Sequence, residues 1–298
     1  MKSGIINVHK EAGYTSFDVV AKMRGILHEK KIGHTGTLDP EATGVLPICI
    51  GKATKVCDLL TDKDKVYEVV MHLGIETDTQ DMTGQVLRQK EVLVTPEEVT
   101  ETILSFQGEI AQIPPMYSAL KVNGQKLCDL ARKGITVERK PRNVVIYSIR
   151  ILQMALPMVK MEVHCSKGTY IRTLCQDIGQ QLGCGACMEQ LVRTRVAQFA
   201  LADSVTLAQV EQLVAQEAVE QILLPVDRVF ASYPAIQAKT CADHKLQNGN
   251  AIFAEEVCQE VSERREKELV RMYLSDGRFV GIFCWKEHQF SPEKMFLE

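Results

Sequence analysis

Several short segments of the chain have the hydrophobic pattern of strands rather than of long helices. Residues 65–73 are rich in β-branched and aromatic residues, including Val66 and Tyr67, and this composition is typical of a strand. Residues 158–165 alternate, so Val159, Met161, Val163 and Cys165 share one face. Further strands are predicted at residues 4–8, 45–50 and 144–152.

Helical patterns lie between these strands. Val20 and Leu27 fall on one face of a helix that we expect Ser16 to cap. Thr95 followed by Pro96 predicts the cap and first turn of a second helix. Further helices are expected at residues 52–60 and from about 169 to 183, and residues 74–84 form an acidic loop. This irregular mixture of elements predicts an α+β fold around a mixed sheet.

The character of the chain changes after Pro225. Short strand-like pieces follow at residues 251–253, 269–274 and 279–285, with turn signals between them. We therefore expect two domains, residues 1–230 and a small β domain at residues 231–298. The charged run at residues 262–268 is expected to be a solvated turn.

Composition favours a globular protein and excludes several classes. The 298 residues are 45% hydrophobic and 24% charged. No apolar run approaches the roughly 18 residues of a membrane span, and none near the start resembles a signal peptide, so we expect a cytoplasmic protein. The ten cysteines are expected to be reduced. Cys184 and Cys187 form a CxxC pair, but no second pair accompanies it, so no zinc site is predicted.

Charge is distributed unevenly along the chain. The net charge is −3, but residues 120–195 contain thirteen Lys/Arg and five Asp/Glu, a net +8 that leaves −11 for the rest. A basic segment of this kind suits binding to phosphates. A solvated face with uneven charge is the alternative explanation. The candidates for phosphate contacts are Lys121, Lys126, Arg132 and Lys167.

A polar loop at residues 33–44 is the first candidate for chemistry. It contains three glycines and a carboxylate that precedes a proline. Pro40 restricts Asp39 to extended conformations, so the carboxylate is held in place. A constrained carboxylate on a loop suits a nucleophile or a general base. An Asp-Pro pair can also simply shape a turn, and the loop residues alone leave both interpretations open.

Residues 51–54 resemble the end of a phosphate-binding loop but do not match its pattern. G-x-x-x-x-G-K-[ST] needs a glycine five positions before the second one. Here the nearest preceding glycine, Gly44, lies seven positions before Gly51, and Ala53 replaces the Ser/Thr. This spacing excludes nucleotide hydrolysis of that type.

A second candidate segment, residues 165–173, runs from a strand end through a glycine turn into a helix. Tyr170 offers a ring for stacking, and Arg172 offers a planar guanidinium for a carboxylate or a phosphate. A helix start with a surface arginine is the alternative interpretation.

In combination these segments resemble the TruB family, the bacterial tRNA pseudouridine-55 synthases. The resemblance extends over about residues 4–200, with the motifs in order. The matching segments are GHTGTLDPEATGVLPICIGKATK at 33–55, DKVY at 64–67, the loop at 74–84, IPPMYSALK at 113–121, CSKGTYIRTL at 165–174, and Leu191 ahead of Arg193. The C-terminal part resembles the small β domain of PUA type that accompanies this family.

One position differs from the family pattern. Where the family has Lys-Pro-x-Gly, this chain has Lys10-Glu11-Ala12-Gly13. Glu11 lacks the rigidity of proline and adds a negative charge beside the expected RNA path, so we expect an effect on the local geometry and the affinity rather than on the reaction.

The resemblance implies a fold and a reaction. The fold is a mixed, largely antiparallel central sheet flanked by helices, the pseudouridine synthase fold, with a PUA-like domain. The reaction is the isomerisation of a uridine to pseudouridine after base flipping, without a metal or an organic cofactor. The implied catalytic residues are Asp39 as the carboxylate, Arg172 as its ion partner, and Tyr67. Implied substrate contacts are Tyr67, Tyr170 and Leu191 at the base and His34 in extrusion, with Lys121 and Lys167 as expected phosphate contacts.

The implied partner is tRNA, bound at the T-loop region by a monomer without guide RNA. Two alternatives stay open: a non-catalytic RNA-binding or RNA-folding protein on the same scaffold, and a synthase within an RNA-guided complex. Asp39, Tyr67 and Arg172 together favour catalysis, because binding alone does not require them. The short N-terminus and the lack of long basic tails favour a stand-alone enzyme.

Overall fold

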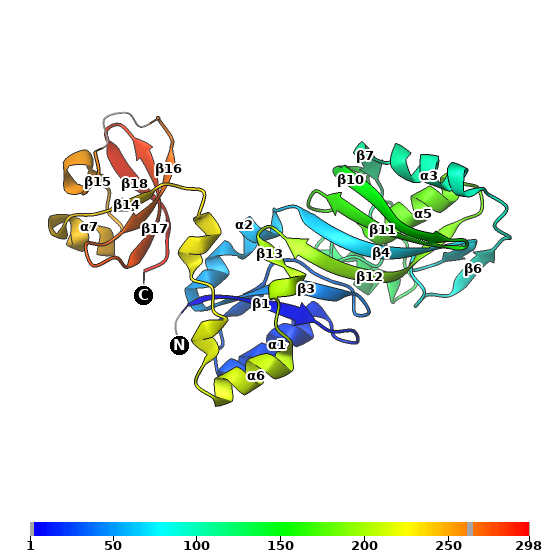
Figure 1. The fold of residues 1–298 in the computed structure, drawn as a ribbon, viewed down its shortest axis with the longest axis horizontal. Helices are drawn as coiled ribbons and strands as arrows, with labels where there is room; N and C mark the ends of the chain where they lie inside the picture. Colours follow the sequence, from blue (N-terminus) through cyan, green and yellow to red (C-terminus); the bar gives the residue numbers. More distant parts are fainter. Residues whose placement is uncertain (1–2, 261–264, 298) are drawn as a thin grey trace.

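The computed structural model describes residues 3–260 and 265–297, and a nine-stranded sheet forms its larger part (Figure 1). The main path of the sheet is β1-β3-β12-β4-β11-β10-β7, with β2 beside β3 and β13 beside β12. Its strands are β1 (Gly4–Lys10), β2 (Ile32–His34), β3 (Thr43–Ile50), β4 (Lys65–Leu73), β7 (Gly108–Gln112), β10 (Arg142–Ala155), β11 (Met158–Cys165), β12 (Ala186–Val196) and β13 (Phe199–Ala200). Within the described residues, β12 and β3 pair in parallel and the other neighbours in this sheet are antiparallel. The predicted mixed, largely antiparallel sheet is confirmed.

Two predicted strands have the expected bounds, while one central strand was not predicted. Residues 65–73 and 158–165 form β4 and β11 as expected. Strand β12 lies between β3 and β4, yet its sequence gives no clear alternation. Register shifts near Gln190 and Arg195 interrupt its two-residue period, because an extra residue moves the following side chains to the other face.

The helices are α1 (Ser16–Leu27), α2 (Cys57–Thr61), α3 (Pro96–Ser105), α4 (Leu127–Ala131), α5 (Ile171–Gln181), α6 (Leu207–Ala215) and α7 (Asp243–Gln247). Thr95 caps α3 as predicted. The predicted cap of α1 is wrong: Thr15 accepts from the backbone N–H of Asp18, and Ser16 is the first helical residue. The helix predicted at residues 52–60 is helical throughout but not one α-helix, because a 3₁₀ segment at Gly51–Val56 precedes the short α2.

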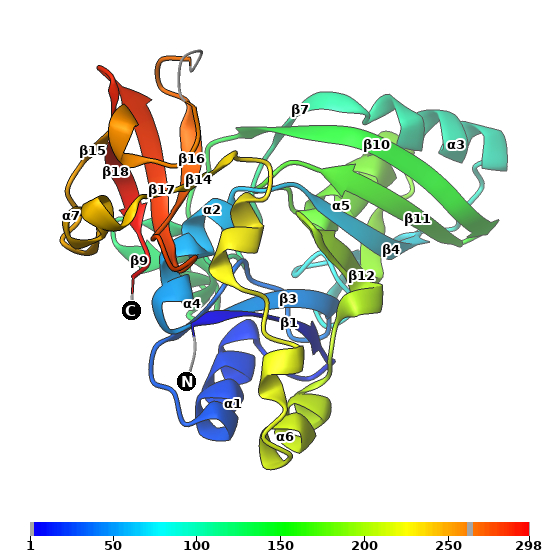
Figure 2. The ribbon, with the colours of Figure 1, turned by 60° about the vertical axis from the view of Figure 1, so that its left-hand side comes forward.

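Helices cover the sheet in two places (Figures 1 and 2). Helices α3 and α5 lie against the part of the sheet formed by β10, β11, β4 and β12, and bury a core that includes Val69, Met161 and Leu174. Helices α1 and α6 lie side by side against β1 and β3. The residues predicted on one face of β11 are all buried there.

A separate five-stranded sheet forms the C-terminal part of the described chain, in the order β14-β16-β17-β18-β15. Its strands are β14 (Ala235–Gln237), β15 (Ile252–Phe253), β16 (Leu269–Tyr273), β17 (Phe279–Lys286) and β18 (Gln289–Met295). The predicted small β domain is confirmed as a β sheet, although β14 and β18 were not predicted. Residues 262–264 of the expected charged turn lie outside the described residues.

The two sheets are joined by a continuous apolar contact. Phe230, from the connection between them, packs with Phe296 at the end of the small sheet, and both belong to an apolar cluster that includes Val45 of the larger sheet. Lys55 donates to the carbonyl of Met295 at 2.8 Å, and Lys52 donates to that of Leu297. The small sheet is therefore packed against the main body.

Two hairpins complete the fold, β5 (Ile75–Thr77) with β6 (Val86–Gln89) and β8 (Lys121–Val122) with β9 (Gln125–Lys126). The segment expected as an acidic loop at residues 74–84 thus contains a short strand. Among the helices of the described residues, none has the length and apolar character needed to cross a membrane.

Candidate active site

The loop that carries Asp39 connects β2 and β3 at the edge of two cavities. Gly44 has a φ of 106°, and a Cβ at this position would collide with the backbone of Arg193 on β12. Only glycine fits such a close approach. The loop therefore runs from the end of β2 to the start of β3, both of which are held in the sheet, and Asp39 lies between these ends.

Arg172 of α5 forms a two-point ion pair with Asp39. Its Nε lies 3.0 Å from Oδ2 and its Nη2 lies 3.1 Å from Oδ1. Nη2 also donates to the carbonyl of Tyr117 at 2.7 Å, and Nη1 donates to that of Thr79 at 3.1 Å. The arginine side chain is 6% exposed, whereas that of Asp39 is 32% exposed. The guanidinium is therefore buried beneath the carboxylate, and the carboxylate is accessible from the cavity. The expected ion pair is present.

A second carboxylate, that of Asp81, was not predicted at this site. Its Oδ2 lies 3.5 Å from Nη1 of Arg172. Its Oδ1 accepts from the hydroxyls of Thr79 and Thr83 and from the backbone N–H of Thr83. The sequence places Asp81 in a loop far from Asp39, and only the folding of that loop over α5 brings the two together.

Burial and charge act in opposite directions on Asp39. Burial raises the pKa of its carboxyl above the usual value, and this effect exceeds the lowering by Arg172. The negative charge of Asp81 raises the pKa further, while Lys10 lowers it. The carboxylate is therefore less hydrated and more basic than an exposed aspartate.

Tyr67 of β4 lies in the wall of the same site and is 7% exposed. Burial raises the pKa of its hydroxyl to about 12, so the phenol is neutral. It is hydrogen-bonded to Arg193, which is fully buried and donates to the carbonyl of Val45 at 2.8 Å. The sequence interpretation quoted Arg193 only as a motif position, yet this guanidinium links Tyr67 to the strand after the Asp39 loop.

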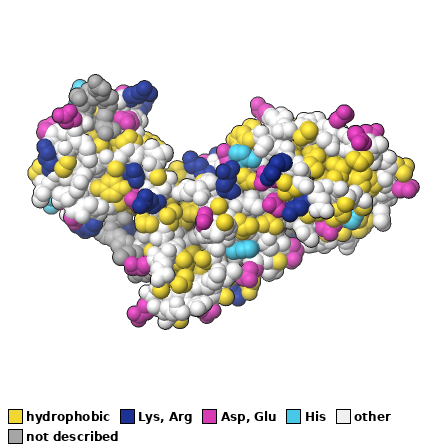
Figure 3. All heavy atoms as spheres, in the orientation of Figure 1, with side chains coloured by type: hydrophobic (Ala, Val, Ile, Leu, Met, Phe, Trp, Pro, Cys, Tyr) yellow, Lys and Arg dark blue, Asp and Glu magenta, His cyan; other side chains and the backbone are white. Residues whose placement is uncertain are grey.

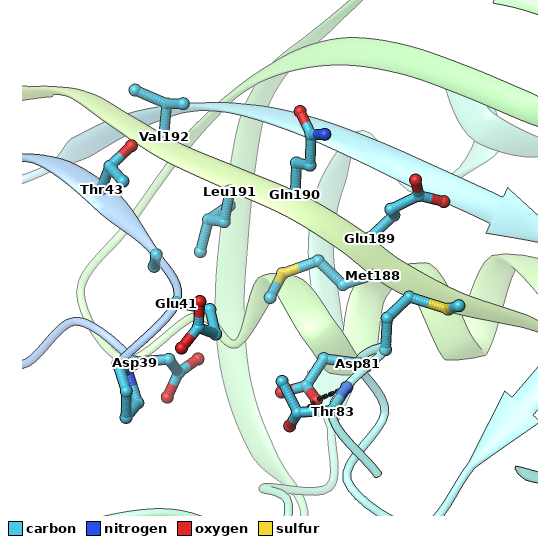
Figure 4. Close-up of a pocket in the computed structure, with 13 residues that line it drawn as sticks. Asp39, Glu41, Thr43, Asp81, Thr83, Met188, Glu189, Gln190, Leu191 and Val192 are labelled. Atoms are coloured by element: carbon cyan, nitrogen blue, oxygen red, sulfur yellow. Dashed lines mark hydrogen bonds between the residues drawn. The ribbon is translucent and has the colours of Figure 1, made fainter. Parts of the chain in front are cut away.

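Two cavities meet at Asp39 and Leu191. The first, about 600 Å³, is bordered by Asp39, Glu41 and Asp81, whose carboxylates face Met188 and Leu191 of β12 (Figure 4). The second, about 530 Å³, contains most of the predicted residues. Its lining includes Asp39, Lys65, Tyr67, Arg142, Lys167, Tyr170, Arg172, Leu191 and Arg193. The second cavity thus combines a carboxylate, two rings and several cations.

The other predicted residues differ in their relation to this cavity. Tyr170 is half-buried in its wall, and burial raises the pKa of its hydroxyl. Lys167 is at the rim and pairs with Asp62 at 2.9 Å. His34 ends β2 and accepts from the backbone N–H of Gly36 at 3.3 Å, but does not line either cavity. Its pKa is lowered by burial. Lys121 is exposed on β8 and lines neither cavity, although Ala119, two residues earlier, borders the second one.

The Asp39 loop is held from the side of β1 and α1 by two polar residues that were not predicted as part of the site. Lys10 is fully buried, and its Nζ donates to the carbonyls of Glu11, Pro40 and Ala42 at 3.0, 2.8 and 2.6 Å. The buried hydroxyl of Ser16 accepts from the backbone N–H of Leu38 at 2.8 Å. Glu11 itself is exposed. These contacts fix the backbone on both sides of Asp39.

Basic side chains gather on one face of the molecule, near its middle and beside the hollow between the two sheets (Figure 3).

Cys184 and Cys187 are both buried free thiols, and Sγ of Cys187 lies 3.3 Å from Sδ of Met82. Within residues 3–260 and 265–297, no three His, Cys, Asp or Glu side chains form a group able to hold a metal ion.

Two protein-family models match the chain. Residues 24–171 match the N-terminal domain of the TruB family pseudouridylate synthases. Residues 172–231 match the C-terminal domain of tRNA pseudouridylate synthase B. The first match contains Asp39, Tyr67 and Asp81, and the second begins at Arg172.

Curated relatives and solved structures agree with these matches. The chain is 52% identical to tRNA pseudouridine synthase B of Lachnoclostridium phytofermentans, over 99% of this chain and 100% of the relative. It is 45% identical to the protein of the same name from Clostridium kluyveri, over 99% of each. A chain from a solved Cbf5-Nop10-Gar1 complex superposes with a TM-score of 0.73 at 28% identity, covering 99% of this chain and 85% of that one. The chain belongs to the TruB family of pseudouridylate synthases, as its motifs indicate.

Proposed function

We propose that this protein isomerises the uridine at position 55, in the T-loop of tRNA, to pseudouridine, with Asp39 as the catalytic carboxylate. The proposal rests above all on the contact between Asp39 and Arg172, which holds an ionised carboxylate at the edge of a cavity. The relatives named tRNA pseudouridine synthase B support tRNA as the substrate.

The target base enters the second cavity, where Tyr67 and Leu191 line the wall beside Asp39. Extruding a base from an RNA fold costs a few kcal/mol, and stacking on an aromatic ring returns about 1–3 kcal/mol. Tyr170 supplies a second ring in this wall. His34 assists extrusion from outside the cavity. Asp39 acts on the nucleotide while Arg172 preserves its ionised form.

Phosphate contacts come from the basic segment. Lys167 at the rim of the cavity and Lys121 on β8 are the two main candidates, and Arg142 in the lining adds a third cation. We propose that residues 1–230 form the catalytic domain and residues 231–298 a PUA-like RNA-binding domain. The protein acts in the cytoplasm as a monomer, and without a guide RNA, although the superposed structure is of a multi-protein complex.

The test is conversion of unmodified tRNA by the purified protein, followed by mapping of the modified position. We expect pseudouridine at position 55 without added guide RNA. Asp39→Asn should abolish the product while tRNA binding stays within about tenfold of the parent. Normal turnover of that variant would remove the central role assigned to Asp39, and a requirement for guide RNA would favour the RNA-guided alternative.

A further inference from the structure

Gln112 is a buried polar side chain that lines neither cavity, and both ends of its amide bind the backbone of Tyr170. It is the last residue of β7 and is 1% exposed. Its Oε1 accepts from the backbone N–H of Tyr170 at 2.8 Å, and its Nε2 donates to the carbonyl of the same residue at 3.0 Å. One amide therefore holds the main chain on both sides of a single Cα.

Tyr170 occupies the point where the glycine turn becomes α5. It is the N-cap residue of α5, and its side chain makes no capping hydrogen bond. The backbone N–H of Leu174 donates to the carbonyl of Tyr170 at 3.0 Å, so the helix binds only one side of this residue. Gln112 binds the N–H that the helix leaves free and shares the carbonyl with Leu174, so the two contacts fix the direction in which the ring leaves the backbone.

We propose that Gln112 is a positioning residue for the reaction, which orients the ring of Tyr170 in the wall of the nucleotide cavity. The backbone of Gln112 pairs with that of Arg142 on β10, so its own position is set by the sheet. Two hydrogen bonds from its amide then hold the backbone of Tyr170 at a set position relative to the sheet. Small displacements of groups around a reacting nucleotide can lower a rate about 100-fold. This inference rests on the proposed function, because it assigns Tyr170 to the base.

The test uses Gln112→Met, which keeps most of the side-chain volume and removes both hydrogen bonds. We expect the single-turnover rate of pseudouridine formation to fall about 10- to 100-fold, while the Kd for tRNA stays within about threefold. The matched control is Gln181→Leu at the exposed end of α5, where a 3.4 Å contact to Ser105 is lost. We expect this control to keep the parent rate.

A double-mutant cycle separates positioning from a general structural role. If Gln112 acts through the ring, Gln112→Met in a Tyr170→Ala background should lower the rate less than about threefold further. Independent, multiplying losses would overturn the inference, as would a parent-like rate for Gln112→Met alone. If Gln112→Met does not fold, Gln112→Asn, which is too short to span both atoms, is tested by the same cycle. Parent activity in the same assay tests the proposed function separately.

Discussion

Nε and Nη2 of Arg172 contact different oxygens of Asp39, at 3.0 and 3.1 Å. Two parallel contacts fix the plane of the carboxylate as well as its charge. Because further bonds from the guanidinium reach the carbonyls of Tyr117 and Thr79, the arginine in turn has one available orientation. The position of Asp39 in the cavity therefore depends on the shape of this side chain.

Arg172→Lys should lower the single-turnover rate about 100-fold, since an ammonium supplies one contact where the guanidinium supplies two. Rates with enzyme in excess over tRNA measure this directly. Arg88→Lys is the matched control, because Arg88 is half-exposed and its 3.8 Å pair with Glu76 lies away from the cavities. Equal rates for Arg172→Lys and the parent would contradict the role of the two-point contact.

Asp81→Asn should shift the acid limb of the pH–rate profile to lower pH. Burial raises the pKa of Asp39, so the rate should fall at a higher pH than for an ordinary aspartate, which titrates near about 3.9. The charge of Asp81 contributes to this raised pKa, and its removal lowers the pKa of Asp39 again. The maximal rate should also fall, because Arg172 loses a carboxylate partner. An acid limb that does not move would show that Asp81 has no electrostatic effect on Asp39.

Lys10→Met should destabilise the Asp39 loop. The carbonyl of Ala42 loses its buried donor, which costs about 1–3 kcal/mol, and the rate should fall because Asp39 lies in the same loop. Urea unfolding and single-turnover rates measure the two effects. Lys22→Met, which removes an exposed contact to Tyr14, is the control. Unchanged stability and rate would show that the loop holds its shape without Lys10.

The stability difference between the parent and Lys10→Met should also depend on pH. Burial lowers the pKa of Lys10 from 10.5 to about 8 in the folded protein. Between these values the unfolded chain binds more protons than the folded one, so the stability of the parent rises relative to the variant as pH increases. Lys65 has the same lowered pKa but is present in both proteins, so its effect cancels. Unfolding at several pH values from 8 to 10.5 tests this sign.

Phe230→Ala should loosen the small sheet from the main body. Phe230 is 6% exposed, and its ring lies 5.8 Å from that of Tyr233 and 5.9 Å from that of Phe296. Loss of a buried phenylalanine costs about 3–5 kcal/mol, and we expect one unfolding transition in the parent to become two in the variant. Phe253→Ala, at an exposed ring, should leave a single transition. Two transitions in the parent would contradict a shared core.

The fold was most predictable where the side-chain period was regular. Strand β11 is clear in the sequence because its buried positions alternate without interruption, and β4 is clear because it is rich in β-branched and aromatic residues, with alternating burial from Tyr67 onward. Strand β12 is not, since its bulges break the period and since Arg193, a charged residue, is fully buried in it. Burial of a charge depends on partners such as Tyr67 that lie far away in the sequence.

The candidate site was predictable from motifs but not from spacing. Asp39 and Arg172 are separated by 133 positions, and nothing local to either indicates their contact. Three further site residues were not predicted for the same reason: Asp81, Lys10 and Ser16. The sequence around each of them is ordinary for a polar residue, and each acts through a contact to a backbone group or a guanidinium far away in the sequence.

The packing of Phe230 and Phe296 between the two sheets has a consequence for selecting RNA. With the sheets held together, the span between the cavity at Asp39 and the surface of the small sheet is constant. An RNA that touches both must offer its two contact points at that one span. If the small sheet binds RNA as proposed, a stem lengthened or shortened by a base pair between the two contact points would reach one surface and miss the other, and we expect selection by length without a contact to a base there.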